Sequence, residues 1–387
     1  MKKILIYHNF SNLLTGGGDY LPLVLLLALQ NTCEVTLALD MRAGFEQALR
    51  AFDVRLDLNR IKIISVMPKG YQLSKHNYFL SLYRFWKLKK LAMMADICIS
   101  TINIMDFGKP AHHFIAHLNF SDDAFTAHLN HSSEKKLFEK FKCLIREKLL
   151  RPLLGMRSKR QIIHDPREHI YPNSLYVENM IKSFYGDFNS TIFYPPTTFE
   201  FHEQKIMHNP LKVVIIGRPS PEKHILEIIE IVERARGLSG KELTLCIAGQ
   251  TEKVSSYVEK LQQIAATRPW ISFVGAKWGE DKERFLLSGT YAIHASKEEP
   301  FGIVVTEYLK AGLIPIVPDQ GGTSEIVDSP ELTYHTLEDG AKILVKLLTD
   351  NSFKEKQWQY CTERAKIFSK NAYWERQSEL LNKIISL

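Results

Sequence analysis

The sequence lacks the marks of several common classes of protein. None of its apolar runs reaches the length of about eighteen residues that a membrane-spanning helix requires. The N-terminal stretch MKKILIYHNF is too short and too polar for a signal peptide. No internal repeat or low-complexity segment is present. We therefore expect a cytoplasmic globular protein.

Cysteine is scarce, and metal-binding patterns are absent. The five cysteines are odd in number, widely spaced and set mostly among apolar residues: Cys33, Cys98, Cys143, Cys246 and Cys361. This distribution predicts reduced core side chains and neither a disulfide framework nor a metal cluster. The sequence has no Asp-x-Asp motif and no His/Cys cluster with metal-ligand spacing. We expect no bound metal and no cofactor.

The remaining composition is ordinary, with a basic balance. The 387 residues suffice for two domains, and contents of 45% hydrophobic and 24% charged residues are typical of globular proteins. The formal net charge is +7. A positive balance favours an anionic partner, which could be a nucleotide, a phospholipid surface or a nucleic acid.

The first half of the sequence alternates short apolar runs with segments of helical length. Lys3–Tyr7 is typical of a buried strand, a polar loop follows, and Tyr20–Leu29 is typical of an apolar helix. The loop contains Gly16-Gly17-Gly18, which would let a ligand phosphate or an acceptor approach the backbone closely. Leu21 stands where a dinucleotide-binding fingerprint requires glycine, which argues against a dehydrogenase.

Four further strands are expected in this half, which predicts a parallel sheet covered by helices on both faces. They lie at Glu34–Leu39, Ile61–Val66, Asp96–Ser100 and Phe114–His117. His117 would end the last strand, at the carboxyl edge where open α/β sheets bind ligands. A single histidine at such a place is more often structural than functional.

The second half repeats this alternation after a polar linker, Glu200–Asn209. A strand at Leu211–Ile216 leads into the loop GRPSPEK, residues 217–223. Arg218 and Lys223 lie five positions apart on this loop, where a guanidinium fork and a compact ammonium group could hold a diphosphate. The alternative is a solvated basic loop. Further strands are expected at Leu243–Ala248, Ile271–Val274, Tyr291–Ala295 and Ile314–Val317.

The segment SKEEPFGIVVTEYLKAGLIPIVPDQGGTSE, residues 296–325, carries the strongest site pattern. A Pro-Phe-Gly turn ending at Gly302 leads into apolar residues at helical spacing. The start of this helix would present free amide groups and a positive dipole end to a phosphate. Glu299 lies on the loop and Glu307 about two turns into the helix, so one carboxylate could face the outer part of a ligand and the other a ribose-like diol. The pattern favours a sugar nucleotide, and the alternative is a strand-turn-helix unit with solvated glutamates.

This segment resembles the E-x7-E signature of retaining family-4 glycosyltransferases of the GT-B fold. The resemblance is carried by Glu299-Pro300-Phe301-Gly302, Glu307, Ala311-Gly312, Pro315 and Gly321-Gly322-x-x-Glu325. The loop at residues 217–223 is similar to the family's phosphate-binding G-R-x-x-x-x-K. The string YAIHASKEEPFGI, which contains His294, together with NS and YPP upstream, most resembles α-1,2-mannosyltransferases of lipid-linked oligosaccharide assembly. The resemblance covers nearly the whole chain, although its specific motifs lie mostly after Ile170.

The resemblance implies an α/β GT-B fold of two Rossmann-like, doubly wound domains that face a cleft. It places an acceptor-binding domain at residues 1–200, a nucleotide-sugar-binding domain at 201–370, and a helix at 371–387 that crosses back to the first domain. It implies a retaining, metal-independent enzyme that moves a sugar, from GDP-mannose or a UDP-sugar, to a glycan or lipid-linked acceptor. Synthesis of a cell-surface polysaccharide or glycoconjugate is the expected context.

The resemblance also assigns roles to individual residues. The donor-binding set is Gly17, Gly217, Arg218, Lys223, Gly249, Glu299, Phe301, Gly302, Ile303 and Glu307, and the catalytic set is His117, Glu299, Arg218 and Lys223. Arg218, Lys223 and the amides near Gly302 would hold the diphosphate. Glu299 would hold the donor sugar, Glu307 the ribose, and His117 would orient the sugar from the opposite domain. The basic residue that usually follows the family's glycine-rich loop is missing here.

Two segments rich in basic and apolar residues, Tyr78–Lys90 and Glu134–Arg160, could contact an anionic membrane surface. A peripheral location on the inner face of a membrane would follow, whereas the second segment would equally suit a helix packed on its own domain. We expect no nucleic-acid partner because no RNA-binding aromatic motif is present. The alternative function from another class is a non-catalytic sugar-nucleotide-binding or membrane-associated scaffold protein.

Overall fold

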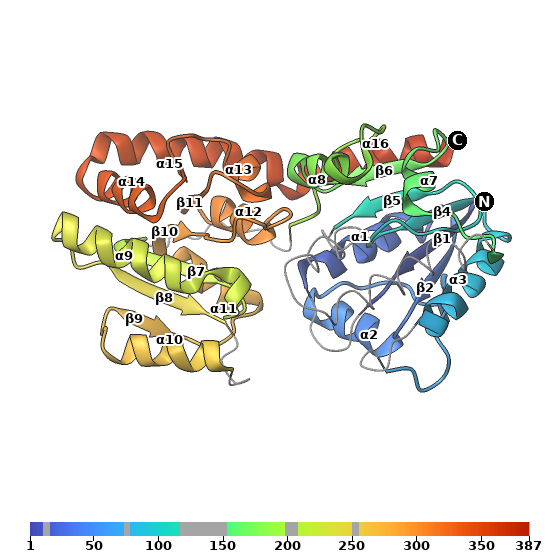
Figure 1. Ribbon diagram of the computed structural model, residues 1–387, viewed down its shortest axis with the longest axis horizontal. Helices are drawn as coiled ribbons and strands as arrows, with labels where there is room; N and C mark the ends of the chain where they lie inside the picture. Colours follow the sequence, from blue (N-terminus) through green and yellow to red (C-terminus); the bar gives the residue numbers. More distant parts are fainter. Residues whose placement is uncertain (11–15, 73–77, 117–152, 198–207, 250–254, 387) are drawn as a thin grey trace, which may run out of the picture. The chain divides into compact units, whose positions relative to one another are not determined.

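The structure is a computed structural model that describes residues 1–10, 16–72, 78–116, 153–197, 208–249 and 255–386 (Figure 1). The chain divides into two compact units. Unit 1 comprises Met1–Pro196 together with Gln377–Leu387, and unit 2 comprises Thr197–Arg376. Each unit contains a six-stranded parallel sheet with helices on both faces. The predicted α/β, doubly wound fold class is confirmed.

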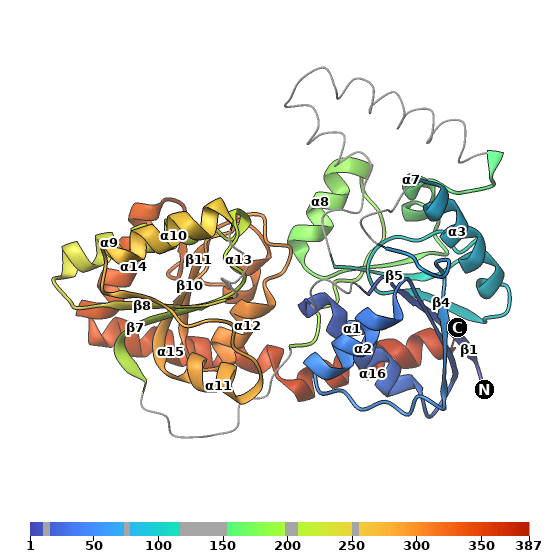
Figure 2. The same cartoon turned by 90° about the horizontal axis from the view of Figure 1, so that it is seen from below.

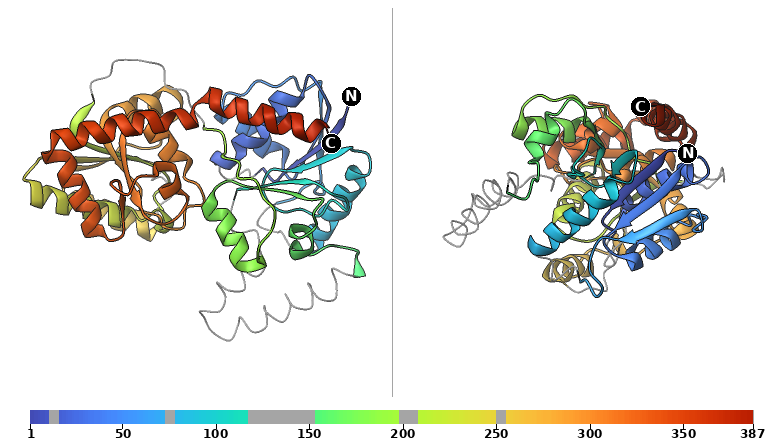
Figure 3. Two further views of the ribbon diagram at one scale, coloured as in Figure 1. Left: turned by 90° about the horizontal axis from the view of Figure 1, so that it is seen from above. Right: turned by 90° about the vertical axis from the view of Figure 1, so that its right-hand side faces the viewer.

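The sheet of unit 1 has the strand order β3-β2-β1-β4-β5-β6. Its strands are β1 (Lys3–His8), β2 (Glu34–Leu39), β3 (Ile61–Ser65), β4 (Ile97–Ser100), β5 (His112–Ile115) and β6 (His169–Pro172). Residues Ile4–His8 of β1 are all buried, as expected for a central strand that is covered on both faces. Helices α1 (Tyr20–Leu29) and α2 (Arg42–Ala51) cover one face, and α3 (Tyr78–Ala92), α7 (Lys159–Ile163) and α8 (Leu175–Tyr185) cover the other (Figures 2 and 3).

Two expectations for unit 1 need correction. The strand expected at Phe114–His117 begins earlier, at His112, and ends at Ile115. The helix expected over Glu134–Arg160 does not run to its predicted end, because the chain turns at Gly155, which has a φ of +63°, and α7 starts separately at Lys159. Most of that segment lies outside the described residues.

The sheet of unit 2 has the strand order β12-β11-β10-β7-β8-β9. Its strands are β7 (Asn209–Ile216), β8 (Thr244–Ala248), β9 (Ile271–Phe273), β10 (Gly289–Ile293), β11 (Ile314–Pro318) and β12 (Thr333–Tyr334). Its helices are α9 (Ile225–Ser239), α10 (Ser256–Ala266), α11 (Gly279–Leu287), α12 (Ile303–Lys310), α13 (Gly322–Val327), α14 (Leu337–Thr349) and α15 (Asn351–Ala365). Figure 2 shows α9 and α10 on one face of the sheet and α11 and α12 on the other.

The C-terminal helix α16 (Lys370–Ser386) begins in unit 2 and continues into unit 1 (Figure 3). Gln377 of this helix is fully buried, and its side chain donates a hydrogen bond to the Val24 carbonyl oxygen of α1 at 3.2 Å. Leu381 and Ile384 are also buried, so the last turns of the chain belong to the core of unit 1. Among the described helices, none is both long and apolar enough to cross a bilayer.

Both sheets contain a topological switch point. In unit 1 the chain builds the sheet outward from β1 through β2 to β3, and then outward in the other direction from β4 to β6. In unit 2 the same reversal lies between β7 and β10. Helical connections from two such strands leave on opposite faces of the sheet, so a crevice opens at the carboxyl ends of the strands. Each unit therefore has one preferred place for a ligand.

Candidate functional site

The candidate site of unit 2 lies at its switch point. The loop after β7 carries Gly217, Arg218 and Lys223, and the segment after β10 carries Glu299 and Gly302. These two loops lie more than seventy residues apart in sequence, but their strands pair directly in the sheet. The fold thus brings the two predicted donor-binding motifs to one edge of one sheet.

Lys223 and Glu299 form the direct contact between the two loops. The Nζ of Lys223 donates a hydrogen bond to Oε2 of Glu299 at 2.6 Å. The side chains are 32% and 19% exposed, so a ligand can reach the pair from solvent. Burial raises the pKa of Glu299, but the contact with His294 and the charge of Lys223 lower it to about 2. Glu299 is therefore an anion at neutral pH, which accepts hydrogen bonds and supplies no proton.

His294 belongs to this site, although its sequence pattern was used only for the family resemblance and predicted no role for it. It is the first residue after β10, and its Nε2 lies 3.5 Å from Oε2 of Glu299. Its side chain is only 7% exposed, and among the described residues its Nδ1 has no hydrogen-bond partner. A buried nitrogen left in this state costs free energy unless a ligand or water bonds to it. A histidine directly after a strand, five positions before Glu299, was the available signal.

Glycines shape both loops. The amide of Gly322 donates to the Glu299 carbonyl oxygen at 2.8 Å, and a Cβ on Gly322 would lie 2.3 Å from the Pro300 carbonyl oxygen. Gly249 packs in the same way under the loop after β7, where a Cβ would lie 2.2 Å from the Gly217 carbonyl oxygen. The structure therefore places Gly249, a predicted donor-binding residue, where it allows the close approach of the loop that carries the cations.

Helix α12 starts directly after the Glu299 loop. Gly302 caps it with a φ of +92°, a conformation that side-chain-bearing residues rarely adopt, and Ile303 is its first residue. The amides of a first helical turn have no helical partners and attract phosphate. The Phe301 side chain is buried and packs edge-on against Phe368, with ring centroids 6.2 Å apart. Phe301 therefore anchors the loop through packing, and its ring does not face solvent.

Glu307 lies in the buried part of α12 and carries an ion pair. The Nζ of Lys282, on α11, lies 2.7 Å from Oε1 of Glu307, and the two side chains are 15% and 3% exposed. Lys282 is a residue that the sequence analysis missed. A ribose can reach the Glu307 carboxylate only if it shares that group with Lys282.

Arg218 is the most accessible cation of the predicted set. Its Nη2 lies 2.9 Å from Oε1 of Glu222, and both side chains are more than half exposed. Exposed pairs of this kind contribute little to stability. The guanidinium group can therefore turn toward an anionic ligand at small cost.

The described end of the loop after β1, residues 16–19, is held at the switch point of unit 1. The short turn Gly17–Asp19 follows β1, and Oδ1 of Asp19 lies 2.9 Å from Nε2 of the buried His8. The Nδ1 of His8 lies 2.9 Å from Oγ1 of Thr101, the first residue after β4. Gly17 therefore lies at the switch point of unit 1. His117 lies outside the described residues.

The arrangement in unit 2 is suited to an anionic ligand with hydroxyl groups. It combines two cations, the free end of a helix and a fixed carboxylate. Within the described ranges, no group of three His, Cys, Asp or Glu side chains could hold a metal ion.

Unit 2 is similar in sequence to known glycosyltransferases. Residues 197–372, nearly the whole of unit 2, match the family model described as Glycosyl transferases group 1. A GDP-Man:Man(3)GlcNAc(2)-PP-Dol alpha-1,2-mannosyltransferase of Candida glabrata is 27% identical over 168 residues, which are 39% of this chain and 32% of that protein. A GDP-mannose-dependent alpha-mannosyltransferase of Mycobacterium tuberculosis is 29% identical over 116 residues, which are 30% of this chain and 27% of that protein. The chain spans about a third of the length of these curated relatives.

Solved structures match the chain over nearly its whole length. Anabaena HepE in complex with UDP and glucose has a TM-score of 0.65 at 15% identity, and the match covers 99% of this chain and 100% of that one. The pneumococcal O-GlcNAc transferase GtfA in complex with UDP and GlcNAc has a TM-score of 0.66 at 10% identity, with 99% of each chain covered. WaaG, a glycosyltransferase involved in lipopolysaccharide biosynthesis, has a TM-score of 0.62 at 13% identity, with 97% and 99% covered. The predicted GT-B fold is confirmed.

Proposed function

We propose, on the premise that unit 2 belongs to the glycosyl transferases group 1 family, that this protein transfers a sugar from a nucleoside-diphosphate sugar to a glycan or lipid-linked acceptor. The observation that carries the proposal is the contact between Lys223 and Glu299 at the switch point of unit 2. A cation for the diphosphate and an anion for sugar hydroxyls are held together there, next to the start of α12.

The donor is held by unit 2 in this proposal. Lys223, Arg218 and the first amides of α12 bind the diphosphate, where negative charge develops as the sugar leaves. Glu299 accepts hydrogen bonds from the sugar hydroxyls, and Glu307 binds the ribose. His117 is proposed to orient the sugar. No metal ion is required, because cationic side chains and amide dipoles supply the electrostatic stabilisation.

The proposed reaction retains the configuration at the anomeric carbon. The bond between that carbon and the diphosphate oxygen breaks, and the acceptor oxygen bonds to the same face of the carbon. The acceptor's proton passes to the leaving phosphate, so no protein base is needed. A double displacement would require a second carboxylate as nucleophile, and we assign no residue to that role.

GDP-mannose is the proposed donor, because both curated relatives described above are named for mannosyl transfer from it. A UDP-sugar is the alternative, since two of the similar structures contain UDP. A thermal-shift series with GDP, UDP, GDP-mannose and UDP-glucose decides between them, because a ligand present at about a hundred times its Kd stabilises the native state by about 2.7 kcal/mol. A selective shift with GDP-mannose would support the proposal. A selective shift with a UDP-sugar would assign a UDP-sugar as the donor instead.

Contact with an anionic membrane is a further part of the proposal, consistent with a lipid-linked acceptor. Helix α3 contains no acidic residue. Phe79 and Trp86, two turns apart, are 79% and 50% exposed, and Lys90 lies over the Trp86 ring at 3.8 Å. Aromatic rings beside lysines suit the boundary between lipid headgroups and acyl chains. Sedimentation with vesicles of phosphatidylglycerol and with vesicles of phosphatidylcholine tests this, and equal pelleting with both would contradict it.

A non-catalytic scaffold that binds sugar nucleotides is the alternative function. It would show the same thermal shifts as an enzyme, so binding alone cannot separate the two. Slow release of nucleoside diphosphate from the donor without any acceptor separates them, because a transferase site lets water act as a poor acceptor. Stable binding without release would favour the scaffold.

A further inference from the structure

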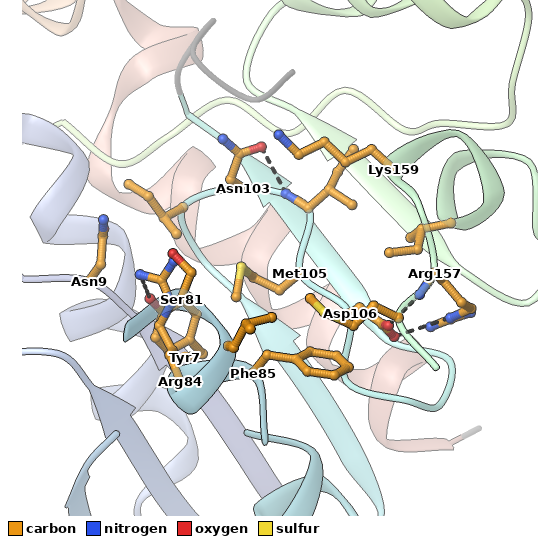
Figure 4. A pocket seen from close by; sticks show the side chains of 15 residues that line it. Tyr7, Asn9, Ser81, Arg84, Phe85, Asn103, Met105, Asp106, Arg157 and Lys159 are labelled. Carbon is orange, nitrogen blue, oxygen red and sulfur yellow. Dashed lines mark hydrogen bonds and ion pairs between the residues drawn. The ribbon is translucent and has the colours of Figure 1, made fainter. Parts of the chain in front are cut away.

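Unit 1 contains a cavity of about 310 Å³ that no role described above uses (Figure 4). Its volume lies at the lower end of the range for small-molecule sites. Tyr7 and Asn9, at the carboxyl end of β1, form part of its lining, and the segment Ile102–Asp106 after β4 forms another part. These strands flank the switch point of unit 1, the position at which doubly wound sheets bind ligands.

The carboxylates around this cavity are already used by the protein. Both oxygens of Asp106 accept hydrogen bonds, Oδ1 from the Gly108 amide at 2.9 Å and Oδ2 from the Arg157 amide at 2.8 Å. The guanidinium group of Arg157 also bonds to Oδ1 (Figure 4). Asp40 does not line the cavity, and it accepts hydrogen bonds from two residues that do, Tyr7 at 3.1 Å and Arg84 at 3.0 Å. These carboxylates therefore have little remaining capacity to accept hydrogen bonds from a ligand.

The polar groups of the cavity lining that can bind a ligand are mainly hydrogen-bond donors. The described bonds of Arg84 all come from Nη1, which donates to the Tyr7 hydroxyl and to Asp40. Its Nε and Nη2 groups remain as donors in the cavity lining. In Figure 4, Arg84 and Asn9 lie on one side of the cavity and Lys159 on another, with Met105 between them. A ligand that fits must present acceptor oxygens to the Arg84 guanidinium group and an apolar face to Met105 and Phe85.

We propose that this cavity binds an anionic substituent, a phosphate or a carboxylate, on the sugar acceptor. The inference rests on the proposed function, which requires an acceptor site, and adds the chemical class of the acceptor. Charge-assisted hydrogen bonds from the Arg84 guanidinium group favour an oxyanion over a neutral hydroxyl, and the positive charge of Lys159 in the lining adds to this preference. A phosphate would come from a sugar phosphate or a lipid-linked sugar, and a carboxylate from a uronic acid.

Calorimetric titration of the full-length protein tests the proposal. The protein is first saturated with the nucleoside diphosphate that stabilises it most, so that the site of unit 2 is occupied. It is then titrated with mannose 6-phosphate, glucuronate, methyl mannoside and inorganic phosphate. The variant Lys159→Gln removes one cation of the cavity, and Arg160→Gln is the matched control, because Arg160 is exposed, lies next to Lys159 in α7 and does not line the cavity. Arg84→Lys keeps a positive charge beside Asp40 but removes the guanidinium group and its additional N–H donors.

We expect an anionic sugar to bind at least tenfold more tightly than methyl mannoside. The Lys159→Gln and Arg84→Lys variants should bind the anionic sugar about tenfold more weakly than the wild type, and Arg160→Gln should bind it as the wild type does. A preference for mannose 6-phosphate assigns a phosphate, and a preference for glucuronate assigns a carboxylate. Equal binding of charged and neutral sugars, or no binding at millimolar concentration in a protein that a nucleotide still stabilises, would overturn the inference and leave the proposed function intact. Failure of every nucleotide to stabilise the protein would instead count against the proposed function.

Discussion

Replacing Glu299 with glutamine tests whether this carboxylate is a fixed anion. The folded protein holds its pKa at about 2, against an ordinary value of 4.5. A difference of that size corresponds to roughly 3 kcal/mol of stability at neutral pH. Because the folded value is the lower one, the stabilisation is complete above about pH 4.5 and is lost as the pH falls toward 2. The Glu299→Gln variant lacks this contribution at every pH.

Urea unfolding of the wild type and the Glu299→Gln variant at about pH 7, 4 and 3 measures the contribution. Tryptophan fluorescence reports mainly on unit 2, which contains four of the five tryptophans. Other carboxylates titrate alike in both proteins, so the difference between the proteins isolates Glu299. We expect a difference of about 3 kcal/mol at pH 7 that shrinks to about 1.5 kcal/mol at pH 3. A difference that stays constant with pH would refute the reasoning.

Three further predictions concern other residues of unit 2. Lys223→Met should weaken nucleoside-diphosphate binding by about tenfold to a hundredfold, through loss of a charge-assisted hydrogen bond, whereas Lys356→Met, which removes an exposed pair, should leave titrated affinity unchanged. Gly322→Ala should abolish nucleotide binding by displacing the loop, whereas Gly237→Ala, whose Cβ meets nothing within 4 Å, should be neutral or stabilising by about 0.5 kcal/mol in a melting experiment. Lys282→Met should lower the free energy of unfolding by about 3 kcal/mol, because it removes the ammonium partner of the buried Glu307 carboxylate. The double variant Lys282→Met, Glu307→Gln should regain part of that stability.

The sequence was sufficient for the strands that carry the site. The apolar runs that become β1, β7 and β10 are bounded by polar or glycine-containing loops, and each appears within a few residues of its expected position. Two strands had no such signal. β6 has four residues and ends in a proline, and β12 has two residues. Their backbone pairing is imposed by the neighbouring strand, so local pattern could not predict it.

Partners within the site were harder to predict than its location. The expected cations and glutamates follow from motifs, but the pairing of Lys282 with Glu307 joins two helices whose packing no local pattern encodes. The motif around His294 resembled that of a known family, but nothing in the sequence indicated that this side chain contacts Glu299. Phe301 was expected to contact the donor, and its burial depends on Phe368, far along the chain. Such contacts arise from tertiary packing.

The most direct test of sugar transfer at the switch point of unit 2 is the release of nucleoside diphosphate from GDP-mannose and UDP-glucose, measured without acceptor and then with sugar acceptors. The wild type should release diphosphate slowly from one donor and faster with acceptor, and the Glu299→Ala variant should be slower by about a hundredfold or more while still binding the nucleotide. Equal release by the wild type and the variant, or tight binding without release from either donor, would contradict the account.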